Sequence, residues 1–222
     1  MRKSKRSAPP TRESVDLRII GGTFRGRKLR YHGDPATRPM KHRVREAIFN
    51  LISTESKGRH AIDLFAGTGA LGLEALSRGA TSATFIEKHV PTARVVQENI
   101  AALGVEPICT LHTTSAFLWS KRDLPNAECG LRIVEVKEGR DSTIPWLVFC
   151  SPPYAFYVDR QNDVLELIDA VLRHAPAESI LVVEADKRFD FNLLPGGVAQ
   201  EKHDRGWDVR TYAPAVVGLW RA

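Results

Sequence analysis

The stretch AIDLFAGTGALGLEALSRGA, residues 61–80, places an apolar run, a glycine-rich loop and a helical apolar pattern in direct succession. Residues 61–65 predict a buried strand, and residues 70–78 predict a helix with Gly79 as its C-terminal cap. A strand that leads through glycines into a helix is the repeating unit of α/β proteins with a parallel sheet. The stretch therefore predicts an α/β fold.

Strand and helix patterns continue to alternate along the rest of the chain. Strands are predicted at 83–87, 107–112, 146–150 and 179–185, helices at 90–103, 115–119 and 162–174, and a terminal antiparallel pair at 206–213 and 215–221. Strands that alternate with helices in this way form a mainly parallel sheet covered on both faces. Such sheets bind ligands at the carboxyl ends of their strands, so functional motifs are expected just after the first, second and fourth strands.

The N-terminal part of the chain has a different character. Residues 1–16 are basic and contain two adjacent prolines, which predicts a disordered tail. Residues 17–55 predict an extension made of a glycine-turned β-hairpin at 17–31 and a helix at 40–52. The α/β domain then covers residues 56–222, and within it residues 120–145 break the alternation and are predicted to be an insertion.

The composition narrows the class of protein. With 222 residues, 43% of them apolar, the chain can bury one good core. It contains neither an apolar run long enough for a membrane span nor a secretory signal pattern, so no membrane association is expected. Cys109, Cys129 and Cys150 are scattered, which predicts reduced thiols in a cytoplasmic protein and no metal site. Nothing indicates an obligate oligomer, so a monomer is expected.

Charge is distributed unevenly between the two ends of the chain. Residues 1–45 contain 14 Lys and Arg against 3 Asp and Glu, whereas the remaining residues contain 18 against 23. A basic segment on a mildly acidic body indicates that the N-terminal part meets a polyanion such as nucleic acid. The alternative is a solvated basic segment that only aids solubility.

The glycine loop predicts a nucleoside cofactor. Gly67, Gly69 and Gly72 form a complete GxGxxG, and Glu87 follows 20 residues after Gly67, at the end of the second strand. This pattern fits the dinucleotide fingerprint, in which the acid accepts ribose hydroxyls. However, Asp63 lies four residues before Gly67, and a carboxylate there would repel a pyrophosphate while it suits a cation. Asp63 therefore favours S-adenosylmethionine (SAM), although it could also be a buried aspartate that binds loop amides.

The motif SPPY, residues 151–154, follows the fourth strand. It resembles the (D/N/S)PP(Y/F) signature of SAM-dependent methyltransferases that act on planar amino groups. In that chemistry the first side chain and the next carbonyl accept hydrogen bonds from the amine, and the aromatic ring stacks on the base. The alternative is a tight Pro-Pro turn without a functional role.

Taken together, the motifs resemble one family, the RsmD-type 16S rRNA guanine-N2 methyltransferases. The resemblance extends from about residue 17 to the C-terminal end and rests on LRIIGGTFRGRKL, TRPMKHRVREAIFNLI, AIDLFAGTGALGLEALSRGA, FIEK and SPPY. It implies a Rossmann-like class I methyltransferase fold, with a seven-stranded mainly parallel sheet, C-terminal antiparallel strands and an N-terminal hairpin and helix. It also implies methylation of a guanine N2 in ribosomal RNA of an assembling small subunit.

The resemblance assigns roles to individual residues. It implies cofactor contacts from Asp63, Phe65, Ala66, Gly67, Thr68, Gly69, Glu87, Lys88 and, by looser alignment, Thr114. It implies a catalytic corner made of Ser151, Pro152, Pro153 and Tyr154. RNA contacts are expected from Arg25, Arg27, Lys28, Arg38, Arg43 and Arg45 in the basic segment.

Three features depart from the family pattern. Ser151 stands where the family usually has Asp, His42 stands where it usually has an acid, and residues 120–145 are longer than its link. A hydroxyl accepts hydrogen bonds less strongly than a carboxylate, so serine could mean a slower enzyme or another amine target.

Four functions therefore remain open at this point. The leading hypothesis is a SAM-dependent rRNA methyltransferase, and the nearest alternative is a methyltransferase of adenine N6 or of a protein glutamine amide. A third is an RNA-binding protein that lost strong catalysis at Ser151, and the most distant is a dinucleotide-dependent oxidoreductase.

Overall fold

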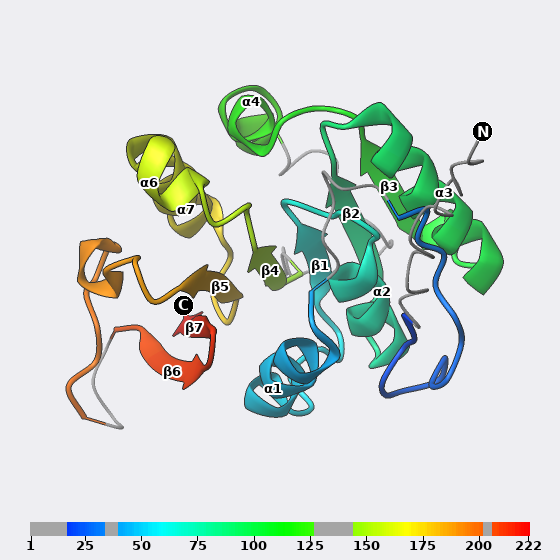
Figure 1. Ribbon diagram of the computed structural model, residues 1–222, viewed down its shortest axis with the longest axis horizontal. Helices are drawn as coiled ribbons and strands as arrows, with labels where there is room; N and C mark the ends of the chain where they lie inside the picture. Colours follow the sequence, from blue (N-terminus) through cyan, green and yellow to red (C-terminus); the bar gives the residue numbers. More distant parts are fainter. Residues whose placement is uncertain (1–16, 34–39, 127–143, 202–205) are drawn as a thin grey trace, which may run out of the picture.

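The computed structural model describes residues 17–33, 40–126, 144–201 and 206–222. The predicted tail at 1–16 and most of the predicted insertion at 120–145 lie outside these residues. The described residues contain a seven-stranded sheet with strand order β3-β2-β1-β4-β5-β7-β6, and its strands stand near the centre of the molecule (Figure 1). This confirms the predicted α/β class.

Five strands are parallel and the last two are antiparallel to their neighbours, as the sequence predicts. The register pairs Asp63 with Phe149 across the two central strands, and Cys150 with Val183 across the next pair. The bounds are β1 (His60–Asp63), β2 (Ser82–Ile86), β3 (Cys109–His112), β4 (Trp146–Cys150), β5 (Ile180–Asp186), β6 (Asp208–Tyr212) and β7 (Ala215–Arg221).

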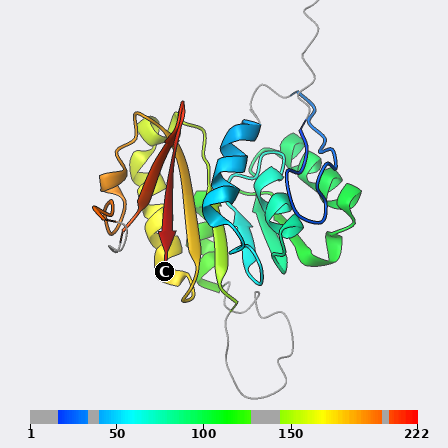
Figure 2. The same ribbon diagram turned by 90° about the horizontal axis from the view of Figure 1, so that it is seen from below.

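Helices cover both faces of this sheet (Figures 1 and 2). One face is covered by α1 (His42–Ile52), α2 (Ala70–Ser77) and α3 (Val90–Leu103). The other is covered by α4 (Ala116–Arg122), α6 (Phe156–Asp159) and α7 (Gln161–His174). Short 3-10 helices lie at Glu106–Ile108, Leu124–Asn126 and Phe191–Leu193.

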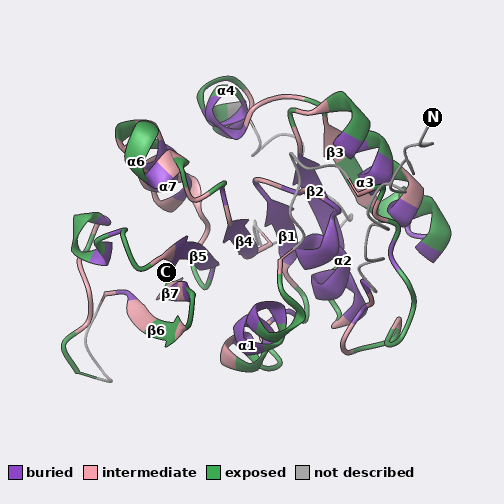
Figure 3. Cartoon of the chain, in the orientation of Figure 1, coloured by how far each residue is buried: buried purple, intermediate pink, exposed green. Residues whose placement is uncertain are grey.

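The central strands are buried along their whole length because helices cover both of their faces (Figure 3). In β4, Leu147 and Phe149 pack into the core beneath α1 and α2, whereas Val148 and Cys150 pack into the core beneath α4 and α7. Alternate side chains of a strand point to opposite faces, so the unbroken apolar run WLVFC supplies both cores at once.

The N-terminal segment is less regular than the predicted hairpin. Its two arms meet only at an isolated antiparallel bridge between Arg18 and Lys28. Backbone bonds from Ile19 N to Arg27 O and from Leu29 N to Leu17 O, 3.0 and 2.8 Å, hold the arms together. The prediction of two regular strands was wrong, because residues of the glycine-rich turn bond to α2 as well as to the opposite arm, where Gly26 N donates to Ile19 O at 2.9 Å.

A buried carboxylate, Glu74 of α2, makes that attachment. Its two oxygens accept the backbone amides of Ile20 and Gly21 at 2.7 and 2.8 Å. The same carboxylate accepts a bond of 2.9 Å from Arg78 Nε and lies 3.9 Å from Arg45 Nε. Glu74 therefore ties the N-terminal segment, α1 and α2 into one core.

The structure corrects the prediction that Arg45 contacts RNA. Its side chain is fully buried, and it donates a hydrogen bond to the carbonyl of Arg18. Burial lowers the pKa of the Arg45 guanidinium, while the nearby Glu74 opposes this change. A side chain enclosed in the core cannot reach a phosphate, so Arg45 holds the fold together instead.

We expect the substitution Glu74→Gln to destabilise the protein by about 3–5 kcal/mol, because it leaves the buried Arg45 without its counter-charge. Chemical denaturation measures this free energy of unfolding. Glu98→Gln is the matched control, since Glu98 forms an exposed ion pair of 3.1 Å with Arg30 and should leave the denaturation midpoint almost unchanged. Equal effects of the two substitutions would contradict the role given to Glu74.

Candidate active site

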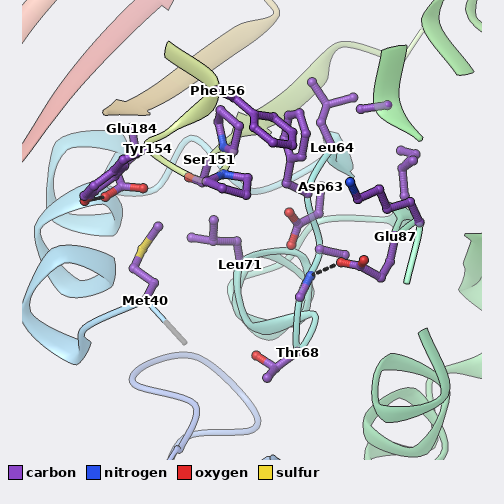
Figure 4. Close-up of a pocket in the computed structure, with 18 of the residues that line it drawn as sticks. Met40, Asp63, Leu64, Thr68, Leu71, Glu87, Ser151, Tyr154, Phe156 and Glu184 are labelled. Atoms are coloured by element: carbon purple, nitrogen blue, oxygen red, sulfur yellow. Dashed lines mark hydrogen bonds between the residues drawn. The ribbon is translucent and has the colours of Figure 1, made fainter. Parts of the chain in front are cut away.

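One cavity of about 560 Å³ opens at the carboxyl ends of the parallel strands. Its walls combine Asp63 at the end of β1, Glu87 after β2 and Ser151 after β4 (Figure 4), and Gly67 of the glycine loop also lines it. The two motifs that the sequence places after separate strands therefore share one space, which is where a doubly wound sheet binds its ligands.

Asp63 is buried at the base of this cavity. Its Oδ2 accepts the Gly72 amide at 3.2 Å, whereas Oδ1 has no hydrogen-bond partner among the described residues. Burial raises the pKa of Asp63 to about 7, and the amide of Gly72 opposes this rise. The Gly72 bond supports the interpretation of Asp63 as a buried aspartate that binds a loop amide, and its contact to a cationic cofactor stays a prediction.

Glu87 joins the loops that follow β1 and β2. Its carboxylate accepts the Gly67 amide at 2.9 Å (Figure 4) and the His89 amide at 2.8 Å. Gly72 has a packing role, since a Cβ atom there would lie 2.4 Å from the Phe85 ring. The glycine loop is thus held close to β2 by both a carboxylate and a tight helix–strand contact.

The structure brings together almost all the residues predicted to contact the cofactor. Gly69 is the exception, because it caps the start of α2 in the left-handed conformation, with φ 77°, and does not line the cavity. The predicted residues that line the cavity are Asp63, Phe65, Ala66, Gly67, Thr68, Glu87, Lys88 and Thr114.

The SPPY corner forms the opposite wall. Ser151, Pro152, Pro153 and Tyr154 all line the cavity. The carbonyl of Pro153 accepts the Phe156 amide at 2.8 Å, which closes the turn into α6. Pro152 is buried, and its carbonyl takes no part in that bond. The corner is a tight turn, as the alternative interpretation has it, but it is one whose side chains face a shared cavity.

Glu184 is a site residue that sequence reasoning missed. It lies near the end of β5, 7% exposed, and lines the cavity beside the SPPY corner. The hydroxyls of Tyr154 and Ser151 both hydrogen-bond to its carboxylate. Burial raises the pKa of Glu184 to about 7, and those two hydroxyls oppose the rise. The one sign of Glu184 in the sequence is that it is the single acid inside the apolar run SILVVEA.

An aromatic cluster on the α4 and α6 side was also missed. The rings of Phe65, Phe117 and Phe156 lie with centroids 5.9 to 6.3 Å apart and line the cavity. The Arg160 guanidinium stacks 4.2 Å above the Phe117 ring. Because these rings come from three separate parts of the chain, no local sequence motif indicates the cluster. The rings are tilted by 38° to 76° to one another and form an apolar wall of the cavity.

Most of the predicted RNA-contacting residues lie on the surface and outside the cavity. Arg25, Arg27 and Lys28 are exposed, and Arg27 donates a bond of 2.5 Å to the Ala102 carbonyl. Arg43 is exposed and donates a bond of 3.1 Å to the carbonyl of residue 213.

The rim of the cavity carries a further cation. Lys41, just before α1, lines it and was not predicted. The predicted contact Arg38 lies outside the described residues.

The described part of the chain has no helix that is long and apolar enough to cross a membrane. It also contains no group of three or more His, Cys, Asp or Glu side chains placed to hold a metal ion.

Comparisons with known proteins agree with the site. The family model described as Conserved hypothetical protein 95 matches residues 17–207. Ribosomal RNA small subunit methyltransferase D of Escherichia coli is 47% identical over 90 residues, which cover 40% of this chain and 46% of that protein. The match thus spans about half the length of the curated relatives.

Solved structures match over more of the chain. A hypothetical protein of Thermus thermophilus is 26% identical, with a TM-score of 0.65, and the match covers 93% of this chain and 99% of that one. An RNA methyltransferase from Salinibacter ruber, solved with S-adenosyl-L-homocysteine, is 13% identical with a TM-score of 0.52. That match covers 83% of this chain and 93% of the other and shows a shared fold.

Proposed function

Because the chain belongs to the family described as Conserved hypothetical protein 95, we propose that it methylates a guanine N2 amine in 16S ribosomal RNA with SAM as donor. The names of its relatives support this activity. The observation that carries the proposal is the shared cavity in which the Asp63 loop faces the SPPY corner. A methyl donor and a planar amine can meet there.

The residues of the β1 and β2 loops fit SAM. Asp63 Oδ1, which is buried without a hydrogen-bond partner among the described residues, would accept the ammonium of its amino-acid part, and Glu87 would accept its ribose hydroxyls. Phe65 and Phe117 would pack against the adenine, with Thr114 nearby. When bound, SAM supplies an electrophilic methyl group.

The corner residues would orient the amine. An exocyclic NH2 is a poor nucleophile because its lone pair is delocalised into the base. Ser151 Oγ and the Pro152 carbonyl would accept its N–H groups and direct the lone pair toward the methyl group. The Tyr154 ring would hold the base flat, as expected for a nucleotide turned out of its helix.

The basic N-terminal part would bind the RNA around that nucleotide. The exposed Arg25, Arg27 and Lys28 would contact phosphates, as would Arg43 and the cavity-rim Lys41. We assign residues 17–55 to this RNA-contacting extension. The partner is ribosomal RNA in an assembling small subunit, met in the cytoplasm by a monomeric enzyme.

The central experiment is methyl transfer from labelled SAM. Purified protein is incubated with naked 16S rRNA, with small subunits that lack this modification, and with an unmodified glutamine-containing peptide. We expect label in RNA, in a guanine that nucleotide mapping locates. Label in adenine or in the peptide would instead support the alternative amine targets.

Ligand binding, measured beside methyl transfer, separates the other two alternatives. SAM binding without transfer to any RNA would leave an RNA-binding protein. A rise in melting temperature with NAD and none with SAM would support the oxidoreductase.

Asp63→Asn should weaken SAM binding by about 10- to 100-fold, because a hydrogen bond to a charged group is worth about 1.5–3 kcal/mol. In the wild type the pKa of about 7 means that the carboxylate is present above that pH and lost below it. Affinity for SAM should therefore fall as the pH is lowered through 7, as calorimetry at several pH values can measure. Adenosine, which lacks the ammonium, is the control and should bind both proteins alike.

The combined substitution of Arg25, Arg27 and Lys28 by Ala should weaken RNA binding. Each lost phosphate contact removes about 0.7–0.9 from the slope of log affinity against log salt. The slope of the triple variant should therefore be smaller by about 2–3, as filter binding across a salt series measures.

A matched control removes the same charge from the other face of the sheet. Lys121, Arg122 and Arg173 are exposed on α4 and α7, and their substitution by Ala should leave the slope almost unchanged. If both triple variants lose the same slope, the N-terminal segment has no special role in RNA binding.

A further inference from the structure

Glu184 and Ser151 are neighbours across the β4–β5 pair. The register pairs Cys150 with Val183, so the next residue of each strand continues the same row. Paired residues of parallel strands point to the same face. Ser151, Tyr154 and Glu184 accordingly lie together at one end of the cavity (Figure 4).

The carboxylate of Glu184 is held by hydroxyl groups. Tyr154 Oη donates to Glu184 Oε1, and the Ser151 hydroxyl also hydrogen-bonds to this carboxylate. Within the described part of the chain, no cation is among the groups that shift its pKa. A serine hydroxyl has one proton and two lone pairs. When it donates to Glu184, its lone pairs remain able to accept an N–H from the cavity.

We propose that Ser151 and Glu184 form a relay that takes up the proton of the methylated amine, with Glu184 as the carboxylate that Ser151 itself lacks. This inference rests on the proposed methyltransferase function. Ser151 touches the amine, and Glu184 acts through it as a positioning residue. The pair would thus replace the aspartate that the related signature usually carries at position 151.

The transfer balances in protons and electrons. The nitrogen lone pair forms the N–C bond to the methyl group, while the C–S bond of the donor breaks and its electron pair stays on sulfur. The nitrogen, now positively charged, gives one N–H proton to Ser151 Oγ. The original hydroxyl proton of Ser151 moves to Glu184, which becomes neutral and later releases it to solvent.

Other titratable groups surround the relay and must be separated from it. Asp63 has a similarly raised pKa, but it would act on SAM binding, so the relay is measured as kcat at saturating SAM. The titratable or charged groups that face Glu184 or share its cavity are Tyr154, Tyr157, Cys150, Asp186, Asp63, Glu87, Lys41, Lys88, His89 and Arg160.

The first test is Glu184→Gln, which keeps the shape and removes the charge. We expect kcat to fall by about 10²-fold, a typical contribution of proton transfer by a positioned group. The affinity for SAM should stay unchanged, and the fall of kcat below pH 7 should disappear. Asp186→Asn is the control, since Asp186 lies on the same strand and pairs at 2.7 Å with Arg188. It should keep the rate and move the fall of kcat only slightly toward lower pH, because the charge of Asp186 contributes to the raised pKa of Glu184.

The second test is rescue by relocation of the carboxylate. Ser151→Asp added to Glu184→Gln should recover most of the lost rate. Ser151→Asp alone should bring no gain, because two adjacent carboxylates cannot both stay ionised. If Glu184 only anchors the tyrosine, Tyr154→Phe would lower kcat as much as Glu184→Gln does, and no rescue would follow.

A spectroscopic measurement needs no methyl transfer. In a carbon NMR titration, Ser151→Ala should raise the pKa of the Glu184 carboxyl above its wild-type value, because the serine bond lowers it. An unchanged pKa would overturn the relay. So would an active wild type whose Glu184→Gln variant keeps its rate. If the wild type methylates no RNA, the proposed function fails as well as the relay. If the wild type is active and only the relay tests fail, the proposed function stands.

Discussion

The central strands β1 and β4 are buried on both faces, and this constraint organises the whole molecule. A strand enclosed in this way has no room for unpaired polar side chains along its length. Polar groups can therefore emerge only where the strands end, and the parallel arrangement brings those ends to one edge. Asp63, Glu87 and Ser151 meet in one cavity because each follows or ends a strand that is otherwise buried.

Three buried carboxylates differ in how far their surroundings compensate their negative charge. Glu74 is surrounded by two backbone amides and two arginines, which compensate its charge fully within the fold. Among the described residues, Asp63 keeps one oxygen without a partner, and Glu184 is given hydroxyls and no cation. Burial raises the pKa of the latter two to about 7. Of these three carboxylates, the two whose negative charge has no cationic partner among the described residues, Asp63 and Glu184, are the two that line the cavity.

The sheet and the glycine loop could be predicted because their signals are local. Apolar runs, glycines and a spaced acid define β1, α2 and Glu87 within 30 residues of one another. Arg45 could not be assigned from the sequence, because its burial depends on Glu74 of another helix. Glu184 and the Phe65–Phe117–Phe156 cluster were missed for the same reason. Each gains its role only when separate strands and helices converge.

The pairing of β1 with β4 also fixes the relative position of the two motifs. Asp63 stands opposite Phe149 in that pair, so Ser151 lies two residues beyond the level of Asp63. A slip of one residue would move Ser151 by about 3.3 Å along the strand and turn alternate side chains to the wrong face. The spacing between Asp63 and Ser151 is therefore set by backbone hydrogen bonds in the middle of the sheet.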